Sequence, residues 1–325
     1  IERLYRAPVA LRLRRLIWAA IVLVAAGGAW LAVMAYPGKQ GERIAVGSKD
    51  FTEQIILGEL MAQLIESHTG LVVRRRFDLG GNLTHEALLA GEIDMYPEYT
   101  GTGLTVILRR KPMSDAKTVY ETVKEQYAAR FGVEWLAPLG FNNTFAILVR
   151  GDDARRLQLR SISDIARYAP AWRAGFGQDF ISRPDGYQGF IRAYGLKFKE
   201  AREMDLSLTY RALAQGQVDV IAGNSTDGLI ARQGLFQLAD DRSYFPPYDA
   251  APLVRQETLV RFPALRDVLN LLAGAISVAE MRELNFQVDG ERRDVKQVAA
   301  DFLRAKGLDR PQKVTRVRGA QPGAP

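Results

Sequence analysis

The sequence contains no cysteine and only two histidines, His68 and His85, among its 325 residues. The lack of cysteine excludes disulfide bonds, thiolate metal sites, cysteine nucleophiles and a lipid attached through a cysteine. A Ser-His-Asp triad or a multi-histidine metal site would have to use His68 or His85. We therefore expect neither an enzyme nor a bound cofactor.

Long charged runs are also scarce, and the formal net charge of +7 is concentrated at the two ends of the chain. The middle of the sequence is nearly balanced and has no basic stripe interleaved with aromatic residues, so we expect no nucleic-acid partner. Hydrophobic residues make up 47% of the chain and charged residues 25%, which is the balance of a folded globular protein.

One long uncharged segment, residues 16–36, follows an arginine-rich stretch. It is long enough to cross a bilayer as a helix, and the positive-inside rule places the arm of residues 1–15 in the cytoplasm. We predict a single-pass anchor in the cell membrane and an extracytoplasmic domain after it. A signal peptide cleaved after small residues such as Val33 and Ala35 is the alternative. The chain opens with Ile1 instead of Met, so a fragment of a permease fusion also stays open.

Strand and helix signals alternate after residue 43. Residues 44–48 are typical of a short buried strand, and Asp50 with Glu53 resembles a helix N-cap and its reciprocal partner. Apolar residues then recur at helical spacing up to residue 65, and 71–77 is typical of a second strand. This order predicts α/β lobes with largely parallel sheets.

The sequence also contains a weak internal repeat. ALLAGEIDMYPEYTG resembles RALAQGQVDVIAGNSTDG: each has a helix end, a glycine, a short strand with Asp94 or Asp219, and then a polar loop. Two lobes that each present such a loop predict a cleft between them, although a glycine, strand and loop in this order is also common in unrelated α/β proteins. The loops contain Tyr96, Glu98, Tyr99 and Thr100 in one copy, and Asn224, Ser225, Thr226 and Asp227 in the other.

The sequence contains a set of longer motifs, which in chain order are VGSKDFTEQIILGELMAQLIE, LGGNLTHEALLAGEIDMYPEYTGTG, NNTFAILVR, RPDGYQGF, STDGLI, PPYDAAPLVR and LNFQVDGERRDVKQVAADFLRAKGL. Taken in this order, they resemble the osmoprotectant substrate-binding proteins of ABC transporters. The resemblance runs from about residue 43 to 308 and implies a bilobed type II periplasmic-binding-protein fold.

In that fold the chain passes between the lobes twice, here near residues 143–149 and 248–253. The resemblance implies that lobe 1 consists of residues 43–145 plus 250–310 and lobe 2 of residues 146–249. Residues 311–325 would form a flexible tail.

A quaternary ammonium ligand has no N–H group to donate, so aromatic faces must hold it through cation–π attraction. The resemblance implies that Tyr96, Tyr187 and Tyr210 form such a cage, with Tyr99 as a second choice. For any single tyrosine the alternative is core packing with a satisfied hydroxyl.

A betaine also carries a carboxylate, for which Lys49 and Arg183 are the candidate partners. Lys49 precedes a helix N-terminus, where backbone amides already favour an anion, but it could also be a solvated surface residue. Arg183 could instead pair with Asp179 or Asp185. The expected polar lining comprises Thr100, Asn143, Thr144 and Thr226.

These expectations together predict the binding component of an ABC importer, with a small quaternary-ammonium ligand and a membrane permease as partners. Glycine betaine, choline, carnitine, proline betaine and betaine-like thiones all stay open as ligands. A membrane-tethered sensory domain, or a binding domain fused to a permease, is the alternative function.

Overall fold

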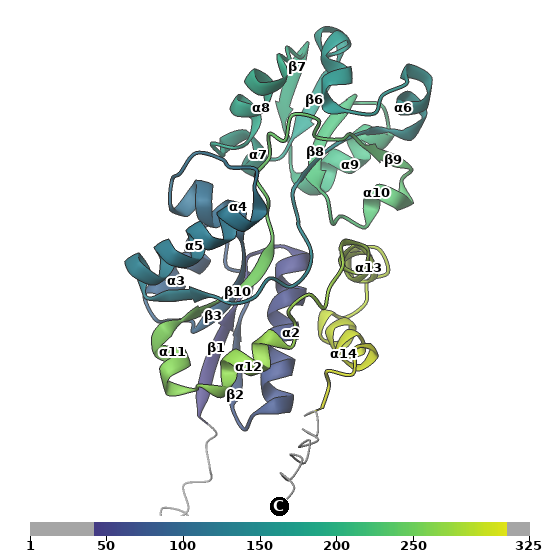
Figure 1. The fold of residues 1–325 in the computed structure, drawn as a ribbon. Helices are drawn as coiled ribbons and strands as arrows, with labels where there is room; N and C mark the ends of the chain where they lie inside the picture. The colour runs from purple at the N-terminus through teal and green to yellow at the C-terminus, as the bar shows by residue number, and fades with distance from the viewer. Residues whose placement is uncertain (1–41, 311–325) are drawn as a thin grey trace, which may run out of the picture. The chain divides into compact units, whose positions relative to one another are not determined.

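The computed structural model describes residues 42–310, which form two five-stranded sheets with helices around them (Figure 1). The predicted arm of residues 1–15, the predicted anchor of residues 16–36 and the predicted tail of residues 311–325 lie outside this part. Among the helices of residues 42–310, none has the length and apolar character needed to span a bilayer.

The first sheet has the strand order β2-β1-β3-β10-β4. Strands β1 and β3 run parallel, and β10 is antiparallel to both of its neighbours. We call this sheet and its helices lobe 1. Its strands are β1 (Arg43–Gly47), β2 (Val72–Arg76), β3 (Met95–Tyr99), β4 (Val133–Trp135) and β10 (Ala250–Arg255). Its helices are α2 (Thr52–His68), α3 (Leu83–Leu89), α4 (Thr100–Thr102), the π-helix η1 (Gly103–Ile107), α5 (Ala116–Phe131), α11 (Gln256–Arg261), α12 (Ala264–Asn270), α13 (Val278–Asp289) and α14 (Val295–Ala305).

The second sheet has the order β7-β6-β8-β5-β9, and we call it with its helices lobe 2. Here β6 and β8 are parallel and β5 is antiparallel to both neighbours. Its strands are β5 (Phe145–Arg150), β6 (Arg173–Phe176), β7 (Glu200–Glu203), β8 (Val220–Asn224) and β9 (Leu235–Gln237). Its helices are α6 (Gly151–Leu157), the 3-10 helices η2 (Ile162–Arg167) and η3 (Ala169–Ala171), α7 (Gln178–Ser182), α8 (Tyr187–Tyr194), α9 (Leu206–Ala214) and α10 (Leu229–Arg232).

The chain passes between the sheets twice, from β4 to β5 and back from β9 to β10, so the predicted two-lobed α/β organisation is confirmed. The two passages run side by side, because Asn142 bridges Asp249 and the Asn143 N–H donates to the Tyr248 carbonyl at 3.1 Å. Both passages end just before the strands β5 and β10 begin. Residues that lie beside these passages can therefore contact both lobes.

The structure corrects the prediction that Tyr96, Glu98 and Tyr99 belong to a loop beyond a strand of residues 93–95. Residues 95–99 are themselves the strand β3, and all five are buried. Tyr96 pairs with Leu253 and Tyr99 with Ala250 across the β10 ladder. Because side chains alternate between the faces of a sheet, Tyr96 and Tyr99, three positions apart, point to opposite faces.

The predicted N-cap at Asp50 is also wrong. Helix α2 begins at Thr52, its N-cap residue is Phe51, and no side chain caps it. Glu53 does not reach back towards the cap; its carboxylate is turned into the protein, where it accepts hydrogen bonds from Tyr99, Asn143 and Asn285. The spacing of Asp50 and Glu53 therefore matched a capping box by chance, while tertiary partners determined where Glu53 points.

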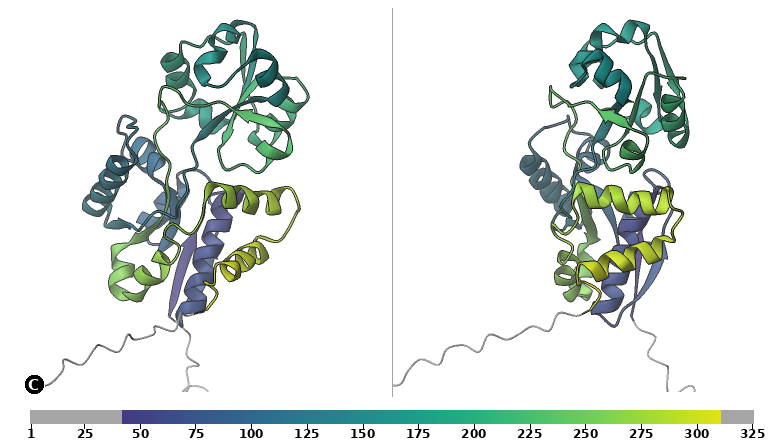
Figure 2. Two further views of the ribbon diagram at one scale, coloured as in Figure 1. Left: turned by 45° about the vertical axis from the view of Figure 1, so that its right-hand side comes forward. Right: turned by 90° about the vertical axis from the view of Figure 1, so that its right-hand side faces the viewer.

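Helices α13 and α14, late in the chain, pack against α2, as both views of Figure 2 show in yellow and purple. From α13, the Arg282 guanidinium donates to the Ser225 carbonyl at 2.7 Å and to the Gln237 Oε1 at 3.1 Å. Both acceptors belong to lobe 2. The C-terminal part of the chain therefore contacts α2 on one side and the loop after β8 on the other.

Candidate functional site

Tyr99, at the end of β3, is held on three sides. Its ring stacks on Phe51 with 6.3 Å between centroids, and the Lys49 Nζ lies 5.6 Å from its ring centroid. Its hydroxyl donates to the Glu53 Oε1 at 2.6 Å. These contacts fix the orientation of an aromatic ring beside one of the two passages between the lobes.

Tyr96 lies on the other face of the sheet, within the core formed with Tyr127 and Trp135. It has no exposed surface, and its hydroxyl donates to the Glu98 Oε2 at 3.0 Å. The structure therefore places the ring of Tyr99, the second choice from the sequence, beside Lys49. Tyr96 lies in the core and reaches Glu98 only through its hydroxyl. The binding role of Tyr96 stays a prediction.

Lys49 follows β1 and forms an ion pair with Glu98 on β3, at 2.6 Å between Nζ and Oε1. The side chain of Glu98 is 1% exposed, and its Oε1 also accepts the Tyr99 N–H at 2.8 Å. The cation predicted to bind a ligand carboxylate thus already has a carboxylate partner within the protein.

Glu53 lies at the junction of lobe 1, lobe 2 and the C-terminal helices. Its Oε1 accepts from the Asn143 Nδ2 at 2.8 Å, and its Oε2 accepts from the Asn285 Nδ2 at 3.0 Å. Within residues 42–310 the salt bridges include none to Glu53. Burial raises the pKa of this carboxyl above its ordinary 4.5, although neutral donors including Tyr99 oppose the rise.

Arg183, between α7 and α8, forms a bidentate ion pair with Asp185, with both N–O distances at 2.9 Å. This pairing is the structural alternative expected from the sequence. Asp185 has no exposed surface and also accepts from the Thr105 Oγ1 of lobe 1 at 2.8 Å. Burial alone would raise the pKa of Asp185, but the hydrogen bonds and charge of Arg183 outweigh it, and the net pKa lies below 3.8.

Tyr248, on the second passage, completes this cluster. Its hydroxyl lies 2.5 Å from the Asp185 Oδ2 and 3.3 Å from the Arg183 Nη2. The guanidinium carbon of Arg183 is 5.4 Å from the Phe145 ring centroid and 5.5 Å from that of Tyr248. Arg183 is therefore flanked by aromatic rings as well as by Asp185.

The other two tyrosines predicted for the cage lie in lobe 2. Tyr187 begins α8, is half-buried, and its ring centroid is 5.3 Å from that of Phe176. Tyr210 on α9 is almost fully buried, and its hydroxyl bonds to Asp227. In the part of the chain that the structure describes, neither ring contacts that of Tyr99, and the binding roles of Tyr187 and Tyr210 stay predictions.

The residues predicted to form the polar lining make hydrogen bonds within the protein. Thr100 is buried and bonds to the Pro247 carbonyl and the Asp249 N–H, which ties β3 to the second passage. The Thr144 N–H donates to the Ser225 Oγ at 3.1 Å. The buried Thr226 offers its carbonyl to the Asn285 Nδ2 at 3.0 Å, one bond away from Glu53.

Sequence reasoning missed five residues that the structure adds to this region: Phe51, Glu53, Phe145, Tyr248 and Asn285. Two signals were present. Phe51 and Glu53 lie inside the motif that starts at Val46 and contains Lys49, and Tyr248 lies in the PPYDAAPLVR block. Asn285 lies in the closing LNFQVDG block, but it is 232 positions from Glu53, so no local pattern pairs the two residues.

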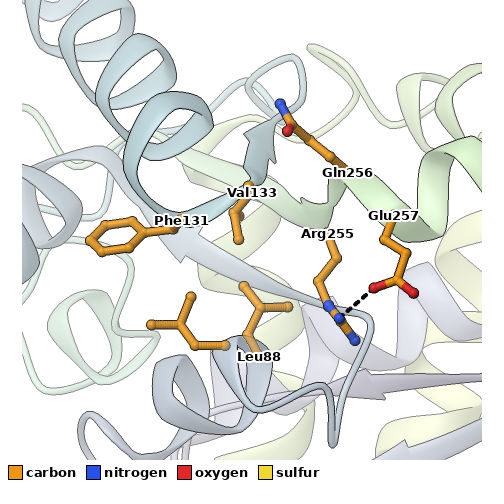
Figure 3. Close-up of a pocket in the computed structure, with 8 residues that line it drawn as sticks. Leu88, Phe131, Val133, Arg255, Gln256 and Glu257 are labelled. Atoms are coloured by element: carbon orange, nitrogen blue, oxygen red, sulfur yellow. Dashed lines mark hydrogen bonds and ion pairs between the residues drawn. The ribbon is translucent and has the colours of Figure 1, made fainter.

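A separate hollow of about 300 Å³ lies on lobe 1, where the ends of α3 and α5 meet the start of α11. Figure 3 shows Leu88, Phe131 and Val133 on one side and the ion pair of Arg255 with Glu257 on the other. It contains none of the binding residues expected from the sequence. The cluster at the two passages, and not this hollow, is the candidate site.

Comparison with known proteins gives a consistent result. A family model described as the substrate binding domain of the ABC-type glycine betaine transport system matches residues 42–305. A carnitine transport binding protein of Listeria monocytogenes is 36% identical over 288 residues, which are 87% of this chain and 94% of that protein. A solved structure described as a glycine betaine/carnitine/choline ABC transporter superposes with a TM-score of 0.73 at 32% identity, over 82% of this chain and 99% of that one.

One further relative has a different organisation. The ergothioneine transport permease/ergothioneine binding protein of Helicobacter pylori is 34% identical over 267 residues. The alignment spans 82% of this chain but only 48% of that protein, about half of its length. The similarity therefore concerns one part of a larger polypeptide.

Proposed function

This chain belongs to the family of substrate-binding domains of ABC-type glycine betaine transport systems, and we propose that it captures a small quaternary-ammonium solute and delivers it to a permease. Its relatives are binding proteins of transporters and not enzymes. The family and the bilobed fold support a reversible binding role, in which no bond is made or broken.

The observation that carries the ligand class is the pairing of cations with aromatic faces at the two passages. Lys49 lies over the ring of Tyr99, and Arg183 lies over the rings of Phe145 and Tyr248. A quaternary ammonium cannot donate a hydrogen bond, so it requires such faces, each contributing roughly 0.5–2 kcal/mol. These rings therefore provide aromatic faces at the passages that a ligand cation could contact.

In the proposed mechanism the two passages act as a hinge, and the ligand binds where residues of both lobes meet. Thr105 of lobe 1 bonds to Asp185 of lobe 2, and Asn285 links Glu53 to Thr226. Contacts that join the lobes would make and break as the hinge moves. A permease could then distinguish occupied from empty protein by the arrangement of the lobes.

We further propose an extracytoplasmic location, with residues 16–36 as the membrane anchor. The support for the anchor is the uncharged segment itself and the arginines before it. Tethering would raise the effective concentration of the binding domain beside its permease. Membrane fractionation of cells that express the chain, with and without residues 16–36, tests this.

The test of the ligand class is calorimetric titration of the full chain with choline, glycine betaine, carnitine and proline, repeated on Tyr99→Ala. We expect saturable binding of at least one quaternary ammonium and a loss of about tenfold or more in the variant. Tyr168→Ala is the matched control, because Tyr168 stacks on Trp172 in lobe 2 away from the passages. Absence of binding to every quaternary ammonium tested would refute the ligand class.

A domain fused to a permease is a second candidate, favoured by the Helicobacter pylori relative whose name combines both activities. The ligand-binding step would be the same, but the permease would be supplied within one polypeptide. Sequencing the gene upstream of Ile1 distinguishes the two cases.

A further inference from the structure

The candidate site holds more acidic than basic side chains. Around Tyr99, Asn143 and Tyr248 the structure places two cations and three carboxylates. The cations are Lys49 and Arg183, and the carboxylates are Glu53, Glu98 and Asp185.

Each cation is matched by a carboxylate of the protein. Lys49 pairs with Glu98 at 2.6 Å, and Arg183 pairs with Asp185 at 2.9 Å. Both acids are almost completely buried, with 1% and 0% of their side chains exposed. Water therefore screens these pairs weakly, and a ligand carboxylate that approaches either cation meets a second carboxylate next to it.

Glu53 is the third carboxylate, and its three partners are neutral. One contact further out, Asp227 accepts from Tyr210, and Arg282 donates to the Ser225 carbonyl. Both cations at the passages thus already have a carboxylate partner, and a ligand without a carboxylate needs no cation from the site.

We propose that this site selects a quaternary-ammonium ligand with a net positive charge, such as choline, over a zwitterion such as glycine betaine, and that Glu98 sets this preference by neutralising Lys49. The inference rests on the proposed function, since it assumes that a quaternary ammonium binds at the passages. Choline and glycine betaine share the trimethylammonium group and differ in a hydroxymethyl group against a carboxylate. They therefore test charge at nearly constant size.

The first experiment measures the affinities of the full chain for choline and glycine betaine by calorimetry at neutral pH. We expect choline to bind at least about tenfold more tightly, because a carboxylate would lie beside Glu98 or Asp185. Equal affinities, or tighter binding of glycine betaine, would overturn the inference while leaving the proposed function intact. If neither ligand binds, the proposed function itself fails.

Two variants assign the preference to the Lys49 end of the site. In Glu98→Gln, Lys49 loses its counter-charge, and the glycine betaine to choline affinity ratio should rise about tenfold. In Lys49→Met, Glu98 loses its cationic partner and keeps only the neutral donors Tyr96 and Tyr99, and that ratio should fall. The opposite directions cannot arise from general loss of structure, and the Lys49 variant keeps the test open if the Glu98 variant does not fold.

Asp152→Asn is the matched control, since its side chain is 93% exposed on lobe 2 and its ion pair within residues 42–310 is with the exposed Arg155. It removes one negative charge without touching the site, and the affinity ratio should stay within about twofold of the unchanged protein. A ratio that rises equally in the Asp152 and Glu98 variants would show that total charge, not Glu98, sets the preference, and would overturn the assignment.

Discussion

The two lobes are built on the same plan but carry different chemistry. The orders β2-β1-β3-β10-β4 and β7-β6-β8-β5-β9 correspond position by position, and the fourth strand of each is antiparallel to its neighbours. Yet β3 reads MYPEY and contributes Glu98 and Tyr99 to the candidate site, while the matching strand β8 reads VIAGN and contributes no charge. A repeated scaffold therefore does not repeat its binding groups.

The shared plan includes one aspartate in each lobe. In lobe 1 the Asp94 Oδ2 accepts the Ala45 N–H at 2.7 Å, and the Asp94 N–H donates to the Ala45 carbonyl at 2.8 Å. In lobe 2 Asp219 forms the same pair of bonds with Arg173, at 2.9 and 2.7 Å. The internal repeat seen in the sequence thus corresponds to a structural clamp between neighbouring parallel strands.

The largest expected effect, on the free energy of unfolding, comes from substituting either of these aspartates. Asp219→Ala should lower the free energy of unfolding by about 3 kcal/mol, because it also removes a carboxylate from Arg150 and Arg173. Asp94→Ala should cost about 2 kcal/mol, because its second oxygen bonds only to the neutral Thr258 hydroxyl. Urea unfolding of the full chain, followed by tryptophan fluorescence, measures both. Equal losses would show that the guanidinium contacts add nothing.

A smaller effect, on ligand affinity, is expected from substituting the two tyrosines on opposite faces of β3. Tyr99→Phe keeps the ring but leaves Glu53 without one of its donors, so ligand affinity should fall about three- to tenfold. Tyr96→Phe removes one donor to Glu98, whose other partners, Lys49 and the Tyr99 N–H, stay in place, so affinity should change by less than about threefold. Calorimetric titration with the tightest-binding quaternary ammonium measures both. A larger effect at Tyr96 would restore it as the main binding residue.

The smallest effect concerns two buried acids whose pKa values move in opposite directions. Burial raises the pKa of Glu53, so its contribution to stability is present below pH 4.5 and is lost as the pH rises through its folded pKa. Although burial opposes it, Arg183 holds the pKa of Asp185 below 3.8, so that contribution is present above pH 3.8 and is lost as the pH falls.

Unfolding free energies of the unchanged protein, Glu53→Gln and Asp185→Asn, measured between about pH 3 and 7, separate the two acids. The stability of the unchanged protein relative to Glu53→Gln should decrease with rising pH. Its stability relative to Asp185→Asn should decrease with falling pH. If both stability differences changed in the same direction with pH, the opposite pKa shifts of Glu53 and Asp185 would be contradicted.

Local patterns predicted much of the scaffold. The strands predicted at residues 44–48 and 71–77 correspond to β1 (Arg43–Gly47) and β2 (Val72–Arg76). Short-range periodicity and glycine stops suffice there, because those elements depend mainly on neighbours in the chain. The pairing of Arg183 with Asp185 was an alternative predicted from the sequence, because only one residue lies between them.

By itself the sequence determined the alternation of strands and helices, the internal repeat and the ordered motifs that indicate the family. Only the tertiary structure decided which face of β3 each tyrosine occupies, because that depends on pairing with β10, more than 150 positions away. It also decided that Glu53 meets Asn143 and Asn285, and that Glu98 neutralises Lys49. Burial and long-range partners set the charge of the site, and neither is visible in local spacing.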